Sequence, residues 1–448
     1  MKALEMTDTL SARFGVPEGV QSQDLPFKKK QETEPTGDIK ERSATSCVFS
    51  PFKFPCGRAN YWIIPLGKYI DGKLVVYAYE VSVSIPGAVC GLNALMQNKV
   101  YEASLLALYF LQYWLLENGV PVEVVKKFSL KNCDLQELHL TYLIYSGSKH
   151  KANHRILELA QRGLTLFSGD VIKKNKRKAA VEYRNSDWNC YTKISKNSKF
   201  DIAAYVKSWV TPNSFCGLSN DVADDIFEIS QNYVRFEVKL KKALFSETVT
   251  LVDADGRKVK KKQPSKWASP LSWKGKAGEA MYKQVLEEAR ELLRLNEKLN
   301  QRRHRPDFMK TLSDEHREIL EKHYAGMPFE DLPFKSKDAK QRSKAKRAIQ
   351  KLCGVDLHIS WEEQKEMPSL DWLEYPGMFK LDAVPEKLWD YAFVDPTIEK
   401  KLQEMKENLR ALVKRNELRS HASAHPSRVR YISQMSDAEL ESDLMGMI

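Results

Sequence analysis

A carboxylate and an imidazole stand two residues apart in the alternating segment Leu135–Tyr145. If this segment is a β-strand, Glu137, His139 and Thr141 share one face of it, because successive side chains point to opposite faces. Glu137 and His139 could then hold one divalent ion. The alternatives are a solvated strand face and a hydrogen-bonded core histidine, and so short a motif favours them when it is taken alone.

A tyrosine and a lysine with the same spacing occur further along the chain, at Tyr191 and Lys193. Free tyrosine has a pKa near 10, so about one molecule in a thousand is phenolate at pH 7, and a nearby cation would activate it as a nucleophile. A strand tyrosine beside a solvent-facing lysine is the ordinary alternative. Tyr205 and Lys207 have the same spacing and make Tyr205 a rival, although we expect Tyr205 on a helix that follows Lys199.

Charged and apolar residues also alternate in the segment Tyr233–Leu240. Arg235, Glu237 and Lys239 fall on one face of the expected strand. Such a face is commonly just solvated. A carboxylate facing the same cleft as His139 could instead supply a further metal ligand or orient the lysine.

Basic residues are concentrated in three places. Two runs each hold five positive charges in six residues, and solvated loops are the commoner explanation of such runs. The first run contains Lys173, Lys174, Lys176, Arg177 and Lys178, and the second contains Arg257, Lys258, Lys260, Lys261 and Lys262. A third set of basic residues lies on the expected helix 337–352, which follows the turn-like segment 325–333. This helix could be the recognition helix of a helix-turn-helix motif. The set comprises Lys340, Arg342, Lys344, Lys346, Arg347 and Lys351.

The composition agrees with a folded protein that has a polyanionic partner. The chain has 448 residues, with 71 lysines and arginines against 59 acidic residues and a net charge of +12. Its seven cysteines are scattered and form no CxxC motif or Cys/His cluster, so we expect neither a structural zinc nor a disulfide framework. The sequence shows no signal peptide and no membrane span, and we expect a cytoplasmic protein.

The element pattern predicts an α+β fold that is built on an antiparallel sheet and followed by a mainly helical region. The expected organisation is a disordered arm over 1–45, a sheet domain over 46–249, a basic linker or exposed hairpin over 250–275, a helical DNA-binding domain over 276–418 and a disordered tail over 419–448. The expected strands are 61–66, 74–85, 135–145, 180–184, 188–194 and 233–241, and the main expected helices are 101–118, 149–162, 280–300, 314–324 and 337–352.

Taken together, the segment between about Val75 and Lys242 resembles the replication initiators of filamentous phages and related plasmids, of the gene-two and gene-ten type. The segments that carry the resemblance are Glu80–Asn93 (EVSVSIPGAVCGLN), Leu135–Tyr142, Tyr191-Thr192-Lys193 and Val234–Leu240 (VRFEVKL). Glu137-Leu138-His139 looks like the HUH motif with its first histidine replaced by glutamate. Filamentous-phage members usually have an aspartate where His139 stands, and no tyrosine of this chain has the lysine three positions later that many HUH nickases carry.

The resemblance implies a rolling-circle initiator that nicks one strand of its origin. Tyr191, assisted by Lys193, would be the nucleophile, and Glu137, His139 and Glu237 would hold Mg²⁺ or Mn²⁺. The products would be a 5′-phosphotyrosine link, which later rejoins the strand, and a 3′-OH for the host polymerase. Arg235, Lys239 and the basic runs would contact the origin DNA, single-stranded or supercoiled.

Other partners and functions are also compatible with the sequence. The chain lacks a GxxxxGK[ST] phosphate loop, so a host helicase would open the duplex. A non-catalytic DNA-binding regulator and a metal-dependent nuclease that uses water are the rival functions. An RNA-binding role suits the charge but leaves the three motifs unexplained.

Overall fold

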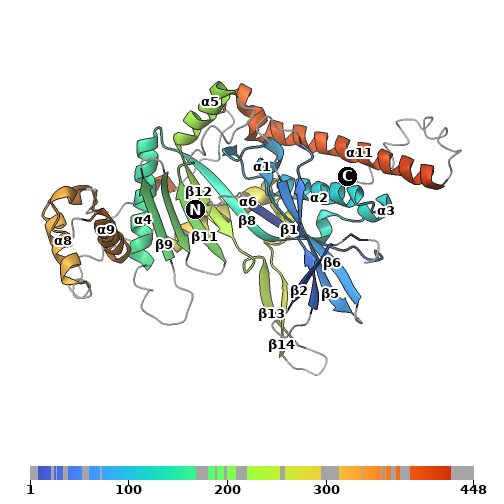
Figure 1. Cartoon of the computed structure of the whole chain (residues 1–448), viewed down its shortest axis with the longest axis horizontal. Helices are drawn as coiled ribbons and strands as arrows, with labels where there is room; N and C mark the ends of the chain where they lie inside the picture. Colours follow the sequence, from blue (N-terminus) through green and yellow to red (C-terminus); the bar gives the residue numbers. More distant parts are fainter. Residues whose placement is uncertain are drawn as a thin grey trace.

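The computed structural model places nine strands in one antiparallel sheet, which confirms the expected mixed fold with a large antiparallel sheet (Figure 1). From edge to edge the strands are β4 (Ser46–Phe49), β5 (Asn60–Ile70), β6 (Lys73–Ser84), β1 (Thr9–Gly15), β8 (Cys133–Tyr145), β12 (Tyr233–Leu240), β11 (Phe200–Tyr205), β10 (Asn189–Ser195) and β9 (Ala180–Ser186). The structure describes residues 9–21, 25–26, 28–33, 39–52, 60–70, 73–167, 180–186, 189–195, 199–207, 219–252, 258–293, 312–335, 338–353, 355, 357–358, 360–364, 370–373 and 384–424.

The N-terminal segment contributes a central strand, so the expectation of a disordered arm over 1–45 is wrong. β1 pairs with β6 on one side and with β8 on the other. Leu10, Ala12 and Phe14 are buried in the core, because the strand alternates apolar and polar residues and its apolar face is covered.

A register shift between β1 and β8 sets the orientation of the candidate residues. Ser11 lies opposite Glu137, whereas Ala12 lies opposite Leu135, so Gln136 is an extra residue on β8. An inserted residue of this kind reverses the alternation locally. Beyond it, Leu138, Leu140 and Tyr142 face the buried side of the sheet.

The apolar face of the sheet packs against α2 (Val100–Glu117), which is buried along most of its length. α6 (Gly275–Leu292) joins the same core, because the Tyr282 hydroxyl accepts the backbone N–H of Val100 at 2.9 Å and the Tyr142 hydroxyl donates to the Tyr282 carbonyl at 2.8 Å. α11 (Asp395–Ala424) runs beside α2 (Figure 1). The sequence had suggested a separate helical domain over 276–418. In the structure, α6 and α11 instead join the core of the sheet.

A second, smaller core lies between α8 (Asp314–Tyr324) and α9 (Ala339–Cys353). The Ser313 side chain caps α8 by accepting the N–H of His316 at 3.3 Å. Both helices occur where the sequence predicts them, so the candidate DNA-reading helix exists as a structural element.

The remaining elements are several short helices and strand pairs and one longer helix that packs against the sheet. They are α1 (Ile85–Cys90), α3 (Val122–Val125), α4 (Lys149–Phe167), α5 (Asn220–Gln231), α10 (Trp361–Gln364), the hairpins β2 (Lys28–Thr33) with β3 (Ile39–Ala44) and β13 (Ser246–Val252) with β14 (Lys258–Pro264), and the parallel pair β7 (Leu95–Met96) with β15 (Ala392–Phe393). α4 contacts strands β9 to β12. Among the described residues, no helix has both the length and the apolar character needed to cross a bilayer.

Candidate functional site

The site begins with the pairing of β8 and β12, which brings two of the sequence motifs side by side. Lys239 lies directly opposite His139, and Glu237 lies directly opposite Thr141. Directly opposite residues of an antiparallel pair share one face of the sheet. The charged face of the Tyr233–Leu240 segment and the Glu137–His139 face therefore form one polar surface, on the side of the sheet away from α2.

Glu137, His139 and Lys239 form a three-residue cluster on this surface. One carboxylate oxygen of Glu137 lies 3.1 Å from His139 Nε2 and 2.5 Å from Lys239 Nζ. The hydrogen bond from His139, with the bond and charge of Lys239 adding to it, lowers the pKa of Glu137 to about 2 from 4.5, although burial acts in the opposite direction. The carboxylate is thus ionised at neutral pH, and 36% of its side chain is exposed.

The ionised carboxylate also determines which histidine nitrogen carries a hydrogen. Two acceptors cannot bond each other, so Nε2 of His139 must donate to Glu137. The other ring nitrogen, Nδ1, is buried and has no hydrogen-bond partner among the described residues. His139 also lines a cavity of about 40 Å³, which is large enough for one water molecule or small ion. Carboxylates orient metal-binding histidines by this kind of contact.

These observations fit a divalent ion only in part. Glu137 supplies an ionised, accessible carboxylate, and His139 supplies an unpartnered nitrogen. Glu137 binds the opposite side of the ring from Nδ1, however, and the Lys239 ammonium already lies on its carboxylate. Within the described ranges, no group of three or more His, Cys, Asp or Glu side chains is arranged to hold a metal.

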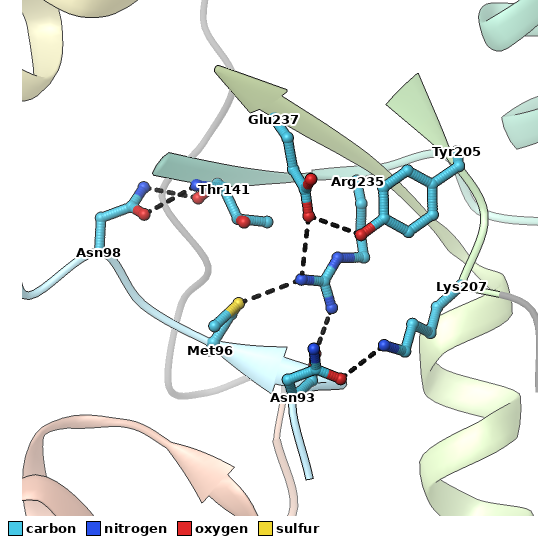
Figure 2. A network of polar contacts seen from close by, with 8 residues as sticks. All are labelled: Asn93, Met96, Asn98, Thr141, Tyr205, Lys207, Arg235 and Glu237. Carbon is cyan, nitrogen blue, oxygen red and sulfur yellow. Dashed lines mark hydrogen bonds and ion pairs between the residues drawn. The ribbon is translucent and has the colours of Figure 1, made fainter. Parts of the chain in front are cut away.

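Glu237, the expected third metal ligand, belongs to a different cluster (Figure 2). Its Oε1 atom accepts the Tyr205 hydroxyl at 2.5 Å and lies 3.4 Å from a guanidinium nitrogen of Arg235. The Glu237 side chain is only 9% exposed. In this conformation its carboxylate neutralises an internal arginine, so the structure does not support its assignment as a ligand beside His139.

Arg235 is an interior residue rather than a DNA contact in this conformation. Its side chain is 1% exposed, and its guanidinium contacts Glu237, the Met96 sulfur at 3.3 Å and the backbone carbonyl of Asn93. The guanidinium carbon also lies 5.5 Å from the centre of the Tyr205 ring. A buried arginine needs such partners, because an unpaired charge in the interior is very unfavourable.

The expected helix at Tyr205 is wrong, since this residue ends strand β11 and is fully buried. Its hydroxyl is held by Glu237, as Figure 2 shows. Beyond the strand, the Lys207 ammonium donates to the Asn93 side-chain oxygen at 2.5 Å. A residue without access to solvent cannot reach a DNA phosphate in this conformation, so the burial of Tyr205 argues against it as the nucleophile.

The segment around β7 closes one end of the polar surface. The Asn98 side chain accepts the Thr141 N–H at 2.9 Å and donates to the Thr141 carbonyl at 2.5 Å, as a neighbouring strand would (Figure 2). Asn93 and Met96 bind Arg235 from the same segment. Asn93 was expected only as part of the family-like segment Glu80–Asn93, and neither Asn98 nor Met96 had a predicted role. Two asparagines in a segment without helix or strand periodicity were the one available signal.

Tyr191 and Lys193 lie on β10, whose backbone is described; the side chain of Tyr191 lies outside the described residues. Tyr191 is the register partner of Tyr205, which pairs in turn with Arg235. β10 is three strands from β8, and Tyr191 is four residues out of line with His139, so their backbones are separated by roughly 14 Å across the sheet and 13 Å along it. The fold therefore does not bring Tyr191 directly onto the Glu137–His139 pair.

Lys193 is a half-exposed cation near the other end of the same surface. Its ammonium lies 3.9 Å from one carboxylate oxygen of Asp201, whose second oxygen binds Lys241 Nζ at 2.5 Å. Lys241 therefore binds Asp201 much more closely than Lys193 does. Asp201 and Lys241 had no predicted role.

The basic regions differ in what the structure says of them. The run with Lys173, Lys174, Lys176, Arg177 and Lys178 lies outside the described residues. On α9, Lys344 and Arg347 are exposed, whereas Lys346 is half-buried with its ammonium 6.0 Å from the Phe329 ring centre. Lys344 and Arg347 are thus more accessible to solvent than Lys346.

Comparison of the chain with protein-family models, with curated proteins and with solved structures found no match. The likeness to phage initiators rests on the sequence motifs alone.

Proposed function

We propose that the chain is a replication initiator that nicks one DNA strand through Tyr191 and later rejoins it. The observation that carries the proposal is the polar surface of the central strands, on which ionised Glu137 contacts His139 and Lys239. Lys193 continues this surface on β10, and the opposite face of the same strands is the hydrophobic core. A polar, partly open sheet face with accessible lysines suits a DNA strand laid across it.

The separation of Tyr191 from Glu137 and His139 divides the proposed work between two groups. Lys193 stands next to Tyr191 and neutralises the scissile phosphate, while Glu137, His139 and Lys239 hold the strand further along the surface. Attack by Tyr191 forms a bond from its oxygen to phosphorus, the bond to the 3′ oxygen breaks, and that oxygen takes up a proton as the tyrosine loses one. Positioning and charge neutralisation are the main requirements of such a phosphoryl transfer.

A hard divalent ion would be bound by Glu137, with His139 as its neighbour and DNA phosphates and water completing the coordination. When bound, it would neutralise phosphate charge and polarise phosphate oxygens. Lys239 opposes this binding, because its ammonium already lies on the Glu137 carboxylate.

A metal-dependent nuclease that uses water is the second candidate, and one observation favours it. The polar partners of Glu137 are His139 and Lys239, and no tyrosine hydroxyl contacts either Glu137 or His139 in the described part of the chain. A phosphate bound there would meet water rather than Tyr191. The two functions differ in their product, because only the tyrosine route leaves protein on the DNA.

Trapping on 5′-labelled and 3′-labelled single strands tests the proposal. A denaturing gel should show the full-length protein covalently attached to the fragment that begins with the cut 5′-phosphate, in a single turnover. Multiple turnovers with free 5′-phosphate ends would establish the water-using nuclease instead. DNA binding without any cleavage would indicate the non-catalytic DNA-binding regulator instead.

A further inference from the structure

The β13–β14 hairpin projects from the body of the protein as a two-stranded ribbon (Figure 1). Each strand has seven residues, which corresponds to a length of roughly 23 Å. The ribbon begins at Ser246, seven residues after Lys239, so it starts at the end of β12 that carries the Glu137–His139–Lys239 cluster. From this position the ribbon could contact a ligand that lies on the polar surface.

The base of the hairpin is fixed to the core, so the ribbon is not merely a loose loop. Leu244 and Phe245 are buried just before β13, and Trp267 is buried just after β14. The Ser265 hydroxyl donates to the Leu244 carbonyl at 2.7 Å, and the Ser265 N–H donates to the Phe245 carbonyl at 3.1 Å. This anchoring gives the arm a defined direction.

Two exposed lysines lie on one face of the ribbon. Lys260 pairs with Thr250 and Lys262 pairs with Thr248, so these two exposed lysines share one face with two threonines. Glu247 lies on the opposite face, where its carboxylate accepts a hydrogen bond from Gln263 at 2.8 Å. Over the described part of the chain, neither lysine forms an ion pair with a carboxylate.

We infer that this ribbon enters the major groove of duplex DNA and holds it next to the polar surface, an inference that rests on the proposed function. The groove of B-form DNA is about 12 Å wide and accepts a two-stranded ribbon, whereas the major groove of A-form RNA is too deep and narrow. Lys260 and Lys262 are about 7 Å apart along the strand, and both can contact phosphates at the groove edge. The arm thus binds the duplex that flanks the cut strand.

The full-length chain with Lys260→Ala and Lys262→Ala tests the inference. Lys276→Ala with Lys283→Ala is the matched control, because it removes the same charge from exposed positions of α6. Binding to a labelled 30-base-pair DNA duplex, to an RNA duplex of the same sequence and to the single strand is measured between 50 and 200 mM salt. Loss of two phosphate contacts should make the slope of log affinity against log salt shallower by about 1.8 on duplex DNA.

We expect this change in the hairpin variant, no change in the control, and adduct formation on the single strand by the wild-type chain. The inference is overturned if the hairpin variant keeps the wild-type salt slope on duplex DNA, or if its slope on the RNA duplex becomes shallower by the same amount. Adduct formation in the same experiment would leave the proposed function standing. The expected change without any adduct keeps the arm and refutes the nickase. A wild-type chain that does not bind duplex DNA overturns the inference outright.

Discussion

Replacing Glu237 by alanine should strongly destabilise the fold, because Glu237 neutralises the buried guanidinium of Arg235. Arg235 is 1% exposed, and the Glu237 carboxylate lies 3.4 Å from its guanidinium. Removing one partner of a buried ion pair leaves an uncompensated charge, which costs about 3–5 kcal/mol. The Tyr205 hydroxyl also loses its acceptor at 2.5 Å.

Urea unfolding followed by circular dichroism measures this effect. Tyr205→Phe should cost less, about 1.5–3 kcal/mol, since it removes a single hydrogen bond to a charged group. The double variant should fall short of the sum, because all three side chains belong to one network. Lys239→Ala is the control on the same strand face, and it should cost under about 1 kcal/mol because its ion pair is one-third exposed.

The outcome also decides the role of Glu237. A carboxylate that served mainly as a metal ligand would be dispensable for folding without metal, and its removal would leave stability unchanged or raise it. That result would refute the internal network and restore Glu237 as a metal ligand. Loss of stability together with retained Mn²⁺ binding would support the structural assignment.

Three further predictions follow from the polar surface and α9. The ion pair of Glu137 should stabilise the fold above pH 4.5, and this stabilisation should be lost as the pH falls towards 2, because folding lowers the pKa of Glu137 to about 2. A pKa shift of this size corresponds to about 3 kcal/mol of stability, which solvent screening reduces to about 1–2 kcal/mol. Glu137→Gln should therefore cost stability at pH 6 and much less at pH 3, and a pH-independent cost would contradict the assigned pair. Lys239→Met should tighten Mn²⁺ binding by about tenfold or more, measured by calorimetry, because the ammonium competes for the Glu137 carboxylate; unchanged binding would place the ion elsewhere. Lys344→Ala with Arg347→Ala should make the salt dependence of duplex DNA binding shallower by about 1.8, whereas Lys346→Ala should change it little, and the reverse order would refute the assigned orientation of α9.

Much of the sheet was predictable from the sequence, because its strands alternate clearly. The expected strands 135–145 and 233–241 correspond to β8 (Cys133–Tyr145) and β12 (Tyr233–Leu240). Their mutual pairing also accounts for the shared polar face. The helix expected over 314–324 has the predicted bounds, since Ser313 provides a recognisable cap.

Long-range partners were not predictable in the same way. β1 lies in a segment rich in polar and charged residues, and its place between β6 and β8 depends on contacts more than sixty residues away. α6 and α11 are amphipathic helices, and periodicity shows which face is apolar but not which surface that face covers. Their packing onto the sheet core therefore came only from the structure.

The sequence predicted the polar surface of the candidate site but not the buried contacts of Arg235 beneath it. Alternation placed Arg235, Glu237 and Lys239 on one face, but burial separates them, so that Lys239 meets solvent while Arg235 does not. What buries Arg235 is the segment from Asn93 to Asn98, which approaches from far along the chain. Tyr205 was expected on a helix that follows Lys199, whereas pairing with β12 places it on a strand.

The most direct test of the proposed function is the covalent adduct formed by wild type, Tyr191→Phe and Tyr205→Phe on a 5′-labelled and a 3′-labelled origin strand. The account predicts an adduct on the 5′-phosphate side with wild type, its complete loss in Tyr191→Phe with DNA affinity retained, and its persistence in Tyr205→Phe at a temperature where that variant is folded. An adduct that survives Tyr191→Phe and disappears in folded Tyr205→Phe would contradict the assignment of the nucleophile. Cleavage by all three proteins without any adduct would contradict the tyrosine mechanism itself.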